Sequence, residues 1–147
     1  MFKMIVLDLD GTTLNDYSVI PQENIDVIND LKDKGYFFVI ATGRPYTNCI
    51  NFYEDLNLNT PMIVDNGATI RHPKDANFKP ILKGISHDFV HQIYAYTKDY
   101  TQSAFFMHMD DTYSFNHTPR LLKIFLIKDT DHVIHCKLDE VTVDPCG

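Results

Sequence analysis

Three short polar clusters in the first half of the chain carry side chains that could act on a phosphate group. Each follows an apolar run, and they are Asp8-Leu9-Asp10-Gly11-Thr12, Thr42-Gly43-Arg44 and Asp65-Asn66-Gly67-Ala68. Carboxylates can serve as nucleophiles or proton carriers, and backbone amides beside a hydroxyl can bind phosphate oxygens. Each cluster alone is an ordinary turn sequence, but three in equivalent positions indicate one shared site.

Asp8 and Asp10 are two residues apart, so an extended backbone would point both carboxylates in the same direction. Crowded carboxylates repel each other unless a cation compensates them, and Mg²⁺ prefers such oxygen ligands. One carboxylate could then attack a substrate while its neighbour transfers protons. A turn with solvated carboxylates is the alternative interpretation. Gly11 would let the backbone turn tightly and a ligand approach.

The second and third clusters could supply the anion-binding part of the site. Thr42 and the amides around Gly43 precede a helix that we expect to begin at Pro45, an arrangement that can bind a phosphate. A helix-entry turn is the simpler alternative for this cluster. Asp65 could either support the site or only form its turn.

The elements that must position these clusters alternate between strand and helix. Continuous apolar runs predict buried strands at residues 4–7, 36–41 and 61–64. The connecting helices begin at Pro21, with Gly35 just past the end of the first, and at Pro45. This order predicts a parallel sheet with right-handed crossovers, which places the clusters at its ligand-binding edge.

From about residue 83 the pattern changes to that of a second, α+β module. We expect a helix from Ser86 to Lys98, and strands at residues 104–109, 112–115, 121–127 and 132–137 in an antiparallel sheet. The aromatic residues of these strands are expected to form a core rather than a substrate platform. The predicted domains are therefore residues 1–82 and 83–147.

Composition and charge exclude several classes of protein. The 147 residues are 44% hydrophobic, enough for a core, and the net charge of −7 argues against nucleic acid as the main partner. No apolar run is long enough for a membrane span, and Asp8 and Asp10 interrupt the N-terminal run before a secretory signal could form. Three cysteines without a CxxC pair favour a reducing, cytoplasmic setting.

Two histidine-containing patterns could be mistaken for zinc sites. His87 and His91 have the i, i+4 spacing of metal ligands, but without an evident third ligand a solvated helix face is the preferred interpretation. His132, His135 and Cys136 resemble half a zinc site, yet strand alternation points the last two to opposite faces. We therefore expect no zinc.

The three polar clusters also carry a family resemblance. The first, Asp8-Leu9-Asp10-Gly11-Thr12, resembles the DxDGT signature of the haloacid dehalogenase (HAD) superfamily. The segments 40–45 and 65–68 are similar to the next two blocks of its Cof-type sugar-phosphatase branch. The resemblance implies an α/β fold in which an HAD-like Rossmannoid parallel sheet, here incomplete, is followed by part of an α+β cap that selects the substrate.

The resemblance also implies a role for each matching residue. Asp8 would attack the substrate phosphorus to form an aspartyl-phosphate, and Asp10 would protonate the leaving alcohol and then activate the hydrolytic water. The Asp8 carboxylate and the Asp10 carbonyl would hold Mg²⁺. The remaining matches would bind the phosphate: Thr42 by a hydrogen bond, Gly43 and Arg44 by shaping its pocket, and Asn66 and Gly67 by lining the floor.

Two later blocks of that branch, a lysine and a Gly-Asp-x-x-Asn-Asp block, do not occur in residues 83–147. We therefore expect a chain truncated within the cap, with little turnover by itself. The edge of the first strand would then be exposed, and copies of the chain could associate through it.

The expected function is Mg²⁺-dependent hydrolysis of small phosphate monoesters such as sugar phosphates. The alternatives are a non-catalytic HAD-like fragment that needs a partner or a missing C-terminal part, and a phosphotransferase or mutase of the same superfamily.

Overall fold

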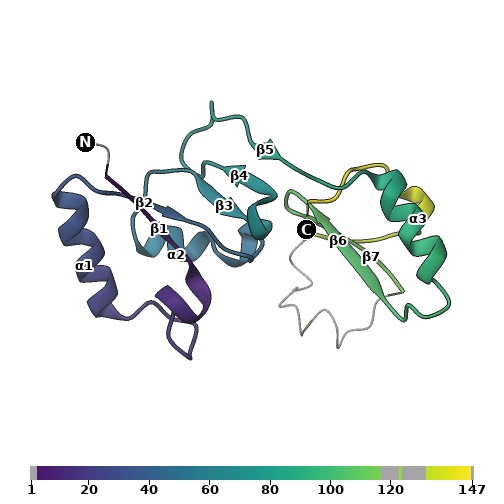
Figure 1. The fold of residues 1–147 in the computed structure, drawn as a ribbon, viewed down its shortest axis with the longest axis horizontal. Helices are drawn as coiled ribbons and strands as arrows, with labels where there is room; N and C mark the ends of the chain where they lie inside the picture. The colour runs from purple at the N-terminus through teal and green to yellow at the C-terminus, as the bar shows by residue number, and fades with distance from the viewer. Residues whose placement is uncertain (1–2, 117–122, 124–131, 147) are drawn as a thin grey trace. The chain divides into compact units, whose positions relative to one another are not determined.

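The computed structural model describes residues 3–116, 123 and 132–146 of the chain (Figure 1). The chain divides into two compact units, residues 1–82 and 83–147. Among the described residues, no helix is both long enough and apolar enough to cross a membrane.

The first unit contains the expected parallel sheet with helices between its strands. β1 (Met4–Leu7) pairs in parallel with β2 (Phe37–Ile40), and a parallel bridge from Ala41 to Ile63 joins β2 to β3 (Met62–Val64). α1 (Gln22–Asp33) connects β1 with β2, and α2 (Ile50–Asp55) connects β2 with β3 (Figure 1). The predicted alternation of strand and helix is confirmed.

Both helices of this unit pack on the same face of the sheet. Ile28 from α1, together with Phe52 and Tyr53 from α2, belongs to one buried cluster with the β2 residues Phe38 and Ile40. Pro21 precedes α1, and Gly35 adopts a φ of 82° just after it, a left-handed conformation that favours glycine. Apolar spacing and end signals thus explain α1 directly.

The second predicted helix is broken near its start. Tyr46–Asn48 forms a short 3₁₀ turn, and Cys49 has a φ of −137°, so the α-helical part begins only at Ile50. The carbonyl of Asn48 accepts a hydrogen bond from Nη1 of Arg44 at 3.4 Å. The break therefore coincides with a contact to a side chain of the second polar cluster.

Two further strands of the first unit were not predicted. β4 (Thr69–Arg71) pairs antiparallel with β3, and β5 (Ile81–Leu82) pairs antiparallel with β4. Their apolar runs are only two or three residues long, too short to give a periodic pattern. They extend the sheet on the far side of β3.

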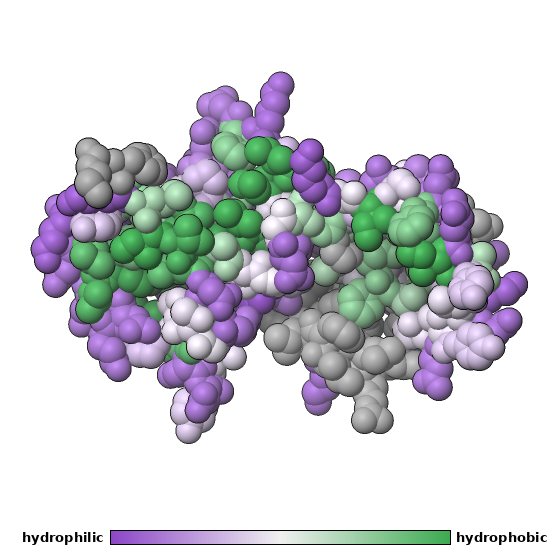
Figure 2. All heavy atoms as spheres, in the orientation of Figure 1, coloured by the Kyte–Doolittle hydropathy of each residue, from purple (hydrophilic) through white to green (hydrophobic). Residues whose placement is uncertain are grey.

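The opposite face of β1 and β2 is apolar and exposed. Met4, Val6 and Phe37 each remain more than half exposed, while Ile5 and Leu7 pack toward the core. Figure 2 shows the resulting apolar patch over these two strands. Within the described part of the chain, β1 pairs with β2 alone, so its other edge is unpaired.

In its described residues, the second unit combines the helix α3 (His87–Thr97) with a small mixed sheet. α3 begins after Ser86, whose Oγ accepts the Phe89 N–H at 3.3 Å, as expected for an N-cap. β6 (Ala104–His108) and β7 (Asp111–Phe115) form the expected hairpin. β8 (Val133–His135) pairs with β7 in parallel, so the expectation of an all-antiparallel sheet is wrong. Of the strand predicted at 121–127, only residue 123 is described, and its backbone is helical.

Aromatic packing forms the core of the second unit, as expected. Phe106 and Phe115 are buried with Val141, and the Tyr94 ring meets the Phe115 ring edge-on with centroids 4.9 Å apart. Edge-to-face contacts of this kind add to the free energy of burial.

The histidines of α3 contact the C-terminal segment of the same unit. His87 Nδ1 lies 2.9 Å from Oδ1 of Asp144, and His91 Nε2 lies 3.1 Å from the carbonyl oxygen of Val141. The hydrogen bonds from His87 lower the pKa of the Asp144 carboxyl below its usual value. These two histidines therefore anchor residues 141–144, and the interpretation as a purely solvated helix face needs this correction.

Replacing Tyr53 by phenylalanine tests the hydrogen bonds that join α2 to the backbone of Thr60. The Tyr53 side chain is fully buried, and its hydroxyl donates to the Thr60 carbonyl at 3.0 Å and accepts from the Thr60 N–H at 3.2 Å. Because Tyr53→Phe leaves both backbone groups without this partner, we expect the free energy of unfolding to fall by about 1–3 kcal/mol.

Urea denaturation measures this change. The control is Tyr17→Phe, because Tyr17 is 86% exposed and the loss of its hydroxyl should change stability by less than about 0.5 kcal/mol. Equal midpoints for the two variants would contradict the prediction.

Candidate active site

The second and third polar clusters lie side by side because backbone hydrogen bonds join them. The Thr42 N–H donates to the Ile63 carbonyl at 3.0 Å, and the Asn66 N–H donates to the Thr42 carbonyl at 3.3 Å. The Asp65 N–H donates to the Arg44 carbonyl at 3.1 Å. The structure thus brings residues 42–44 and 65–67 together at the carboxyl ends of β2 and β3.

Gly43 is required by the close approach of Asn66. A Cβ atom at position 43 would lie 2.7 Å from Oδ1 of Asn66, closer than real contacts allow. Asp65, Asn66 and Gly67 have consecutive positive φ values of 53°, 54° and 93°, a conformation that is uncommon for residues other than glycine. This turn directs the Asn66 side chain across Gly43, where both can face an anion.

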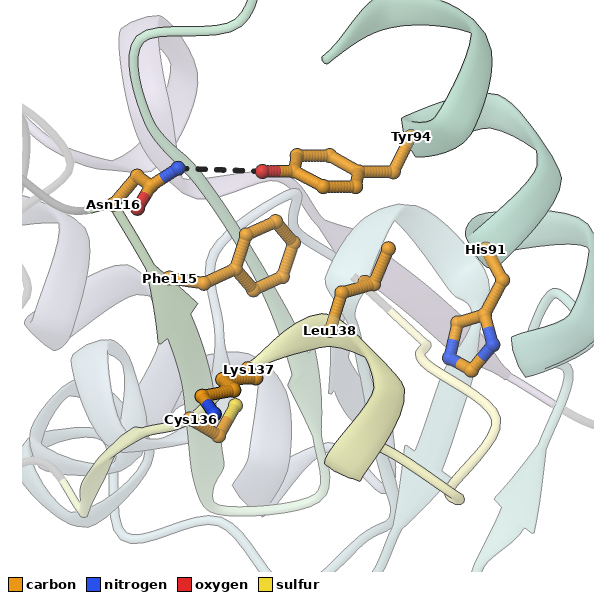
Figure 3. Close-up of a pocket in the computed structure, with 7 residues that line it drawn as sticks. All are labelled: His91, Tyr94, Phe115, Asn116, Cys136, Lys137 and Leu138. Carbon is orange, nitrogen blue, oxygen red and sulfur yellow. Dashed lines mark hydrogen bonds between the residues drawn. The ribbon is translucent and has the colours of Figure 1, made fainter.

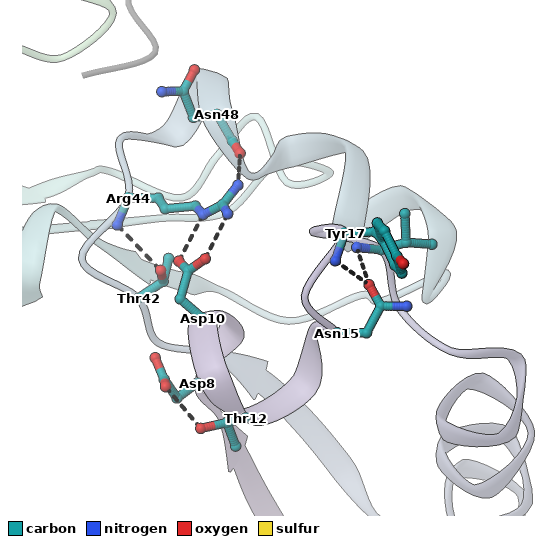
Figure 4. Close-up of polar contacts among 9 residues, drawn as sticks. Asp8, Asp10, Thr12, Asn15, Tyr17, Thr42, Arg44 and Asn48 are labelled. Carbon is teal, nitrogen blue, oxygen red and sulfur yellow. Dashed lines mark hydrogen bonds and ion pairs between the residues drawn. The ribbon is translucent and has the colours of Figure 1, made fainter. Parts of the chain in front are cut away.

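The first cluster forms a wide turn directly after β1. Residues Leu9–Thr13 close it through a hydrogen bond from the Leu14 N–H to the Leu9 carbonyl at 2.9 Å, and Gly11 takes the positive φ of 72° expected of it. The Thr12 hydroxyl donates to Oδ2 of Asp8 at 3.0 Å (Figure 4). The turn therefore holds the Asp8 carboxylate in one orientation.

Asp10 is paired with Arg44. Nε of Arg44 donates to Oδ2 of Asp10 at 2.7 Å, and Nη2 donates to Oδ1 at 2.6 Å. Figure 4 shows the Asp10 carboxylate turned toward Arg44 and the Asp8 carboxylate beside Thr12. An arginine of this chain therefore offsets the negative charge of Asp10, a contribution that was not expected in addition to that of a divalent cation.

This pair determines the electrostatics of the site. The hydrogen bonds from Arg44 hold the pKa of Asp10 below its usual value, and partial burial opposes this shift only in part. Hydrogen bonding to Asp10 likewise raises the pKa of Arg44. Asp10 is therefore ionised at neutral pH in this arrangement. The sequence analysis missed the pair, although opposite charges just after two neighbouring strands were the available signal.

The oxygen donors near Asp8 fit Mg²⁺ as part of its coordination sphere. Mg²⁺ commonly takes one or two protein carboxylates and completes its octahedron with water and substrate phosphate. The Asp8 carboxylate can serve in this way, whereas both oxygens of the Asp10 carboxylate bind Arg44. No group of three or more His, Cys, Asp or Glu side chains that could hold a metal occurs in the described part of the chain.

A cavity of about 430 Å³ lies within the second unit (Figure 3). It lies between α3 and the end of β7, and its lining residues are His91, Tyr94, Phe115, Asn116, Cys136, Lys137 and Leu138. The Asn116 amide donates to the Tyr94 hydroxyl at 3.3 Å across it. None of these residues carries a carboxylate, so the cavity offers no carboxylate nucleophile. It was not predicted from the sequence.

Comparison with known proteins identifies a family and several relatives of this chain. A family described as haloacid dehalogenase-like hydrolase matches residues 5–143. The 5-amino-6-(5-phospho-D-ribitylamino)uracil phosphatase YitU of Bacillus subtilis is 33% identical over 129 residues, which cover 87% of this chain and 48% of that protein. The pyridoxal phosphate phosphatase YbhA of Escherichia coli is 33% identical over 88 residues, or 56% of this chain and 32% of YbhA.

Solved structures share the fold. A haloacid dehalogenase-like hydrolase from Bacteroides thetaiotaomicron superposes with a TM-score of 0.79 at 19% identity, covering 99% of this chain and 56% of that one. TM0651 from Thermotoga maritima gives a TM-score of 0.73 at 26% identity and covers 92% and 50%, respectively. The chain thus spans about half the length of YitU and of both solved structures.

Replacing Gly43 by alanine tests the contact with Asn66. The new methyl group would push the Asn66 side chain out of its position, so binding of inorganic phosphate should weaken by about 10–100-fold, the loss of one hydrogen bond to a charged group. Stability should change little, because the displaced atoms belong to the end of a flexible side chain.

The control is Gly35→Ala, which places a side chain at a φ of 82° at the opposite end of β2 from the clusters. It should lower the free energy of unfolding by about 1–2 kcal/mol and leave phosphate affinity unchanged. Calorimetry and urea denaturation measure the two quantities. Equal phosphate affinity in Gly43→Ala and the unmodified chain would contradict the proposed contact.

Proposed function

The chain belongs to the family of haloacid dehalogenase-like hydrolases, and from this membership we propose that it carries the nucleophile and acid–base residue of a Mg²⁺-dependent phosphatase. In this proposal residues 1–82 form part of the catalytic core and residues 83–147 part of the cap. The observation that supports it most is the pairing of Asp8 with Thr12 and of Asp10 with Arg44, which holds two carboxylates in separate environments after one strand.

Asp8 is the proposed nucleophile. An oxygen of its carboxylate attacks the phosphorus of the substrate, the bond from phosphorus to the alcohol oxygen breaks, and an aspartyl-phosphate forms. The hydrogen bond from Thr12 fixes which oxygen of Asp8 is engaged and leaves Oδ1 as the attacking atom. Such fixed orientation is a large part of the catalysis of phosphoryl transfer.

Asp10 is the proposed acid and base. Arg44 keeps Asp10 ionised in the ligand-free site, so the carboxylate first takes up a proton from water once that contact is broken. In the first step the protonated Asp10 gives this proton to the departing alcohol oxygen. In the second step it accepts a proton from the water that attacks the aspartyl-phosphate, and the bond from phosphorus to Asp8 breaks to release inorganic phosphate. A carboxylate used in both directions regenerates its starting state.

The remaining residues bind the phosphate. The Thr42 hydroxyl accepts the Arg44 backbone N–H at 3.1 Å, so its own hydrogen is left to donate to a phosphate oxygen. Asn66 and the amides around Gly43 bind the other oxygens. Mg²⁺, held by the Asp8 carboxylate and the Asp10 carbonyl, would supply charge stabilisation for the phosphoryl group when bound.

The proposed substrates are small phosphate monoesters such as sugar phosphates. The names of YitU and YbhA specify phosphatases of two different small phosphorylated compounds. In this proposal, residues 83–147 select the part of the substrate that differs between such compounds, and the polar clusters bind only the phosphate.

A non-catalytic role is the second candidate. It is favoured by the contact of both Asp10 carboxylate oxygens with Arg44, which keeps this carboxylate away from Asp8 and from a metal beside it. A protein of this kind would bind phosphate without forming a covalent intermediate. The two candidates differ in one measurable product, the phosphorylated Asp8.

Transfer of labelled phosphate to Asp8 tests the proposal. The chain is incubated with Mg²⁺ and a panel of labelled phosphate monoesters, quenched in acid and mapped by peptide mass spectrometry. We expect the label on Asp8, none in Asp8→Asn, and a longer-lived label in Asp10→Asn, because loss of acid–base catalysis slows hydrolysis by about 10²–10⁴-fold.

Asp16→Asn is the matched control, since Asp16 is an exposed carboxylate in the same segment but outside the clusters. It should be labelled and dephosphorylated like the unmodified chain. Phosphate binding with no label on Asp8 for any monoester would favour the non-catalytic candidate.

A further inference from the structure

We propose that Arg44 is a positioning residue with two successive partners, Asp10 in the ligand-free site and the substrate phosphate in the occupied one. This inference rests on the proposed function. Arrival of the phosphate would replace Asp10 at the guanidinium and so release the acid–base carboxylate only when there is a substrate to act on.

The geometry of the pair shows why a release is needed. Both carboxylate oxygens of Asp10 accept N–H groups of the same guanidinium, at 2.7 and 2.6 Å. The carboxylate is therefore directed at Arg44 and not toward Asp8, where the leaving alcohol and the hydrolytic water would lie (Figure 4). For its proposed role, Asp10 must turn away from this contact.

Burial shows which partner is free to move. The Arg44 side chain is only 16% exposed, whereas that of Asp10 is 57% exposed. Arg44 is also held by the Asn48 carbonyl at 3.4 Å, and its guanidinium carbon lies 5.3 Å from the centroid of the Phe52 ring. The cation is thus fixed from several sides, and the exposed carboxylate is the partner that can leave.

The position of Arg44 makes phosphate the matching replacement. Its backbone N–H donates to the Thr42 hydroxyl at 3.1 Å, so the guanidinium and the proposed phosphate donors belong to one turn. The guanidinium fork pairs with two oxygens of a phosphate as well as with a carboxylate, and a phosphate dianion carries the larger charge. Phosphate and the Asp10 carboxylate therefore compete for the same N–H groups of the Arg44 guanidinium.

Nuclear magnetic resonance of the nitrogen-15-labelled chain tests this competition. Inorganic phosphate is titrated at constant ionic strength. The Arg44 Nε–H signal reports changes at the guanidinium, and the Gly43 amide signal reports phosphate binding at residues 42–44. We expect both signals to shift with the same affinity. In Asp10→Asn the Arg44 signal should already differ without phosphate, and phosphate should bind up to about fivefold more tightly, as for loss of an exposed ion pair.

Asp8→Asn is the matched control, because it also removes one negative charge from the site but leaves the fork paired with Asp10. Its Arg44 signal without phosphate should match that of the unmodified chain, and its gain in affinity should be smaller than that of Asp10→Asn. Equal gains in the two variants would mean that charge alone matters and would overturn the proposal.

The pattern of shifts distinguishes failure of the exchange at Arg44 from failure of the phosphate site itself. If phosphate shifts the Gly43 amide but not the Arg44 Nε–H, Arg44 is a permanent partner of Asp10, and the exchange is overturned while the phosphate site stands. If neither signal responds, the phosphate site of the proposed function fails, and the exchange fails with it.

Discussion

The ion pair between Arg44 and Asp10 is the interaction on which the rest of the site depends. It joins the turn after β1 to the turn after β2, while backbone hydrogen bonds join the latter to the turn after β3. Without it, the Asp10 carboxylate would lose its guanidinium partner while lying only two residues from Asp8. One arginine therefore helps to hold the three turns in a common arrangement and keeps the proposed nucleophile Asp8 and the proposed acid–base residue Asp10 apart.

Much of the first unit could be predicted because local signals and tertiary structure agree there. Proline and glycine mark the ends of α1, and the apolar runs mark β1, β2 and β3. The break at Cys49 could not be predicted, because it coincides with the contact from Arg44 to the Asn48 carbonyl. β4 and β5 escaped prediction because runs of two or three residues carry no period.

The residues of the candidate site were easier to predict than their contacts. All three clusters lie just after strands of one sheet, which the order of elements and the parallel direction imply. The partner of Asp10 depends on how the turn at Gly11 orients a side chain toward a residue 34 positions away, and no local pattern encodes that. In the second unit the parallel pairing of β8 is likewise a tertiary choice.

The contact between Gly43 and Asn66 has a consequence for how this sequence can diverge. The amide of Asn66 fills the space that a methyl group at position 43 would need. A descendant that gains side-chain volume at position 43 must therefore lose it at position 66, and the two positions should change together rather than drift independently. Covariation of positions 43 and 66 across a family alignment would show that related proteins keep this contact between the two proposed phosphate-binding turns.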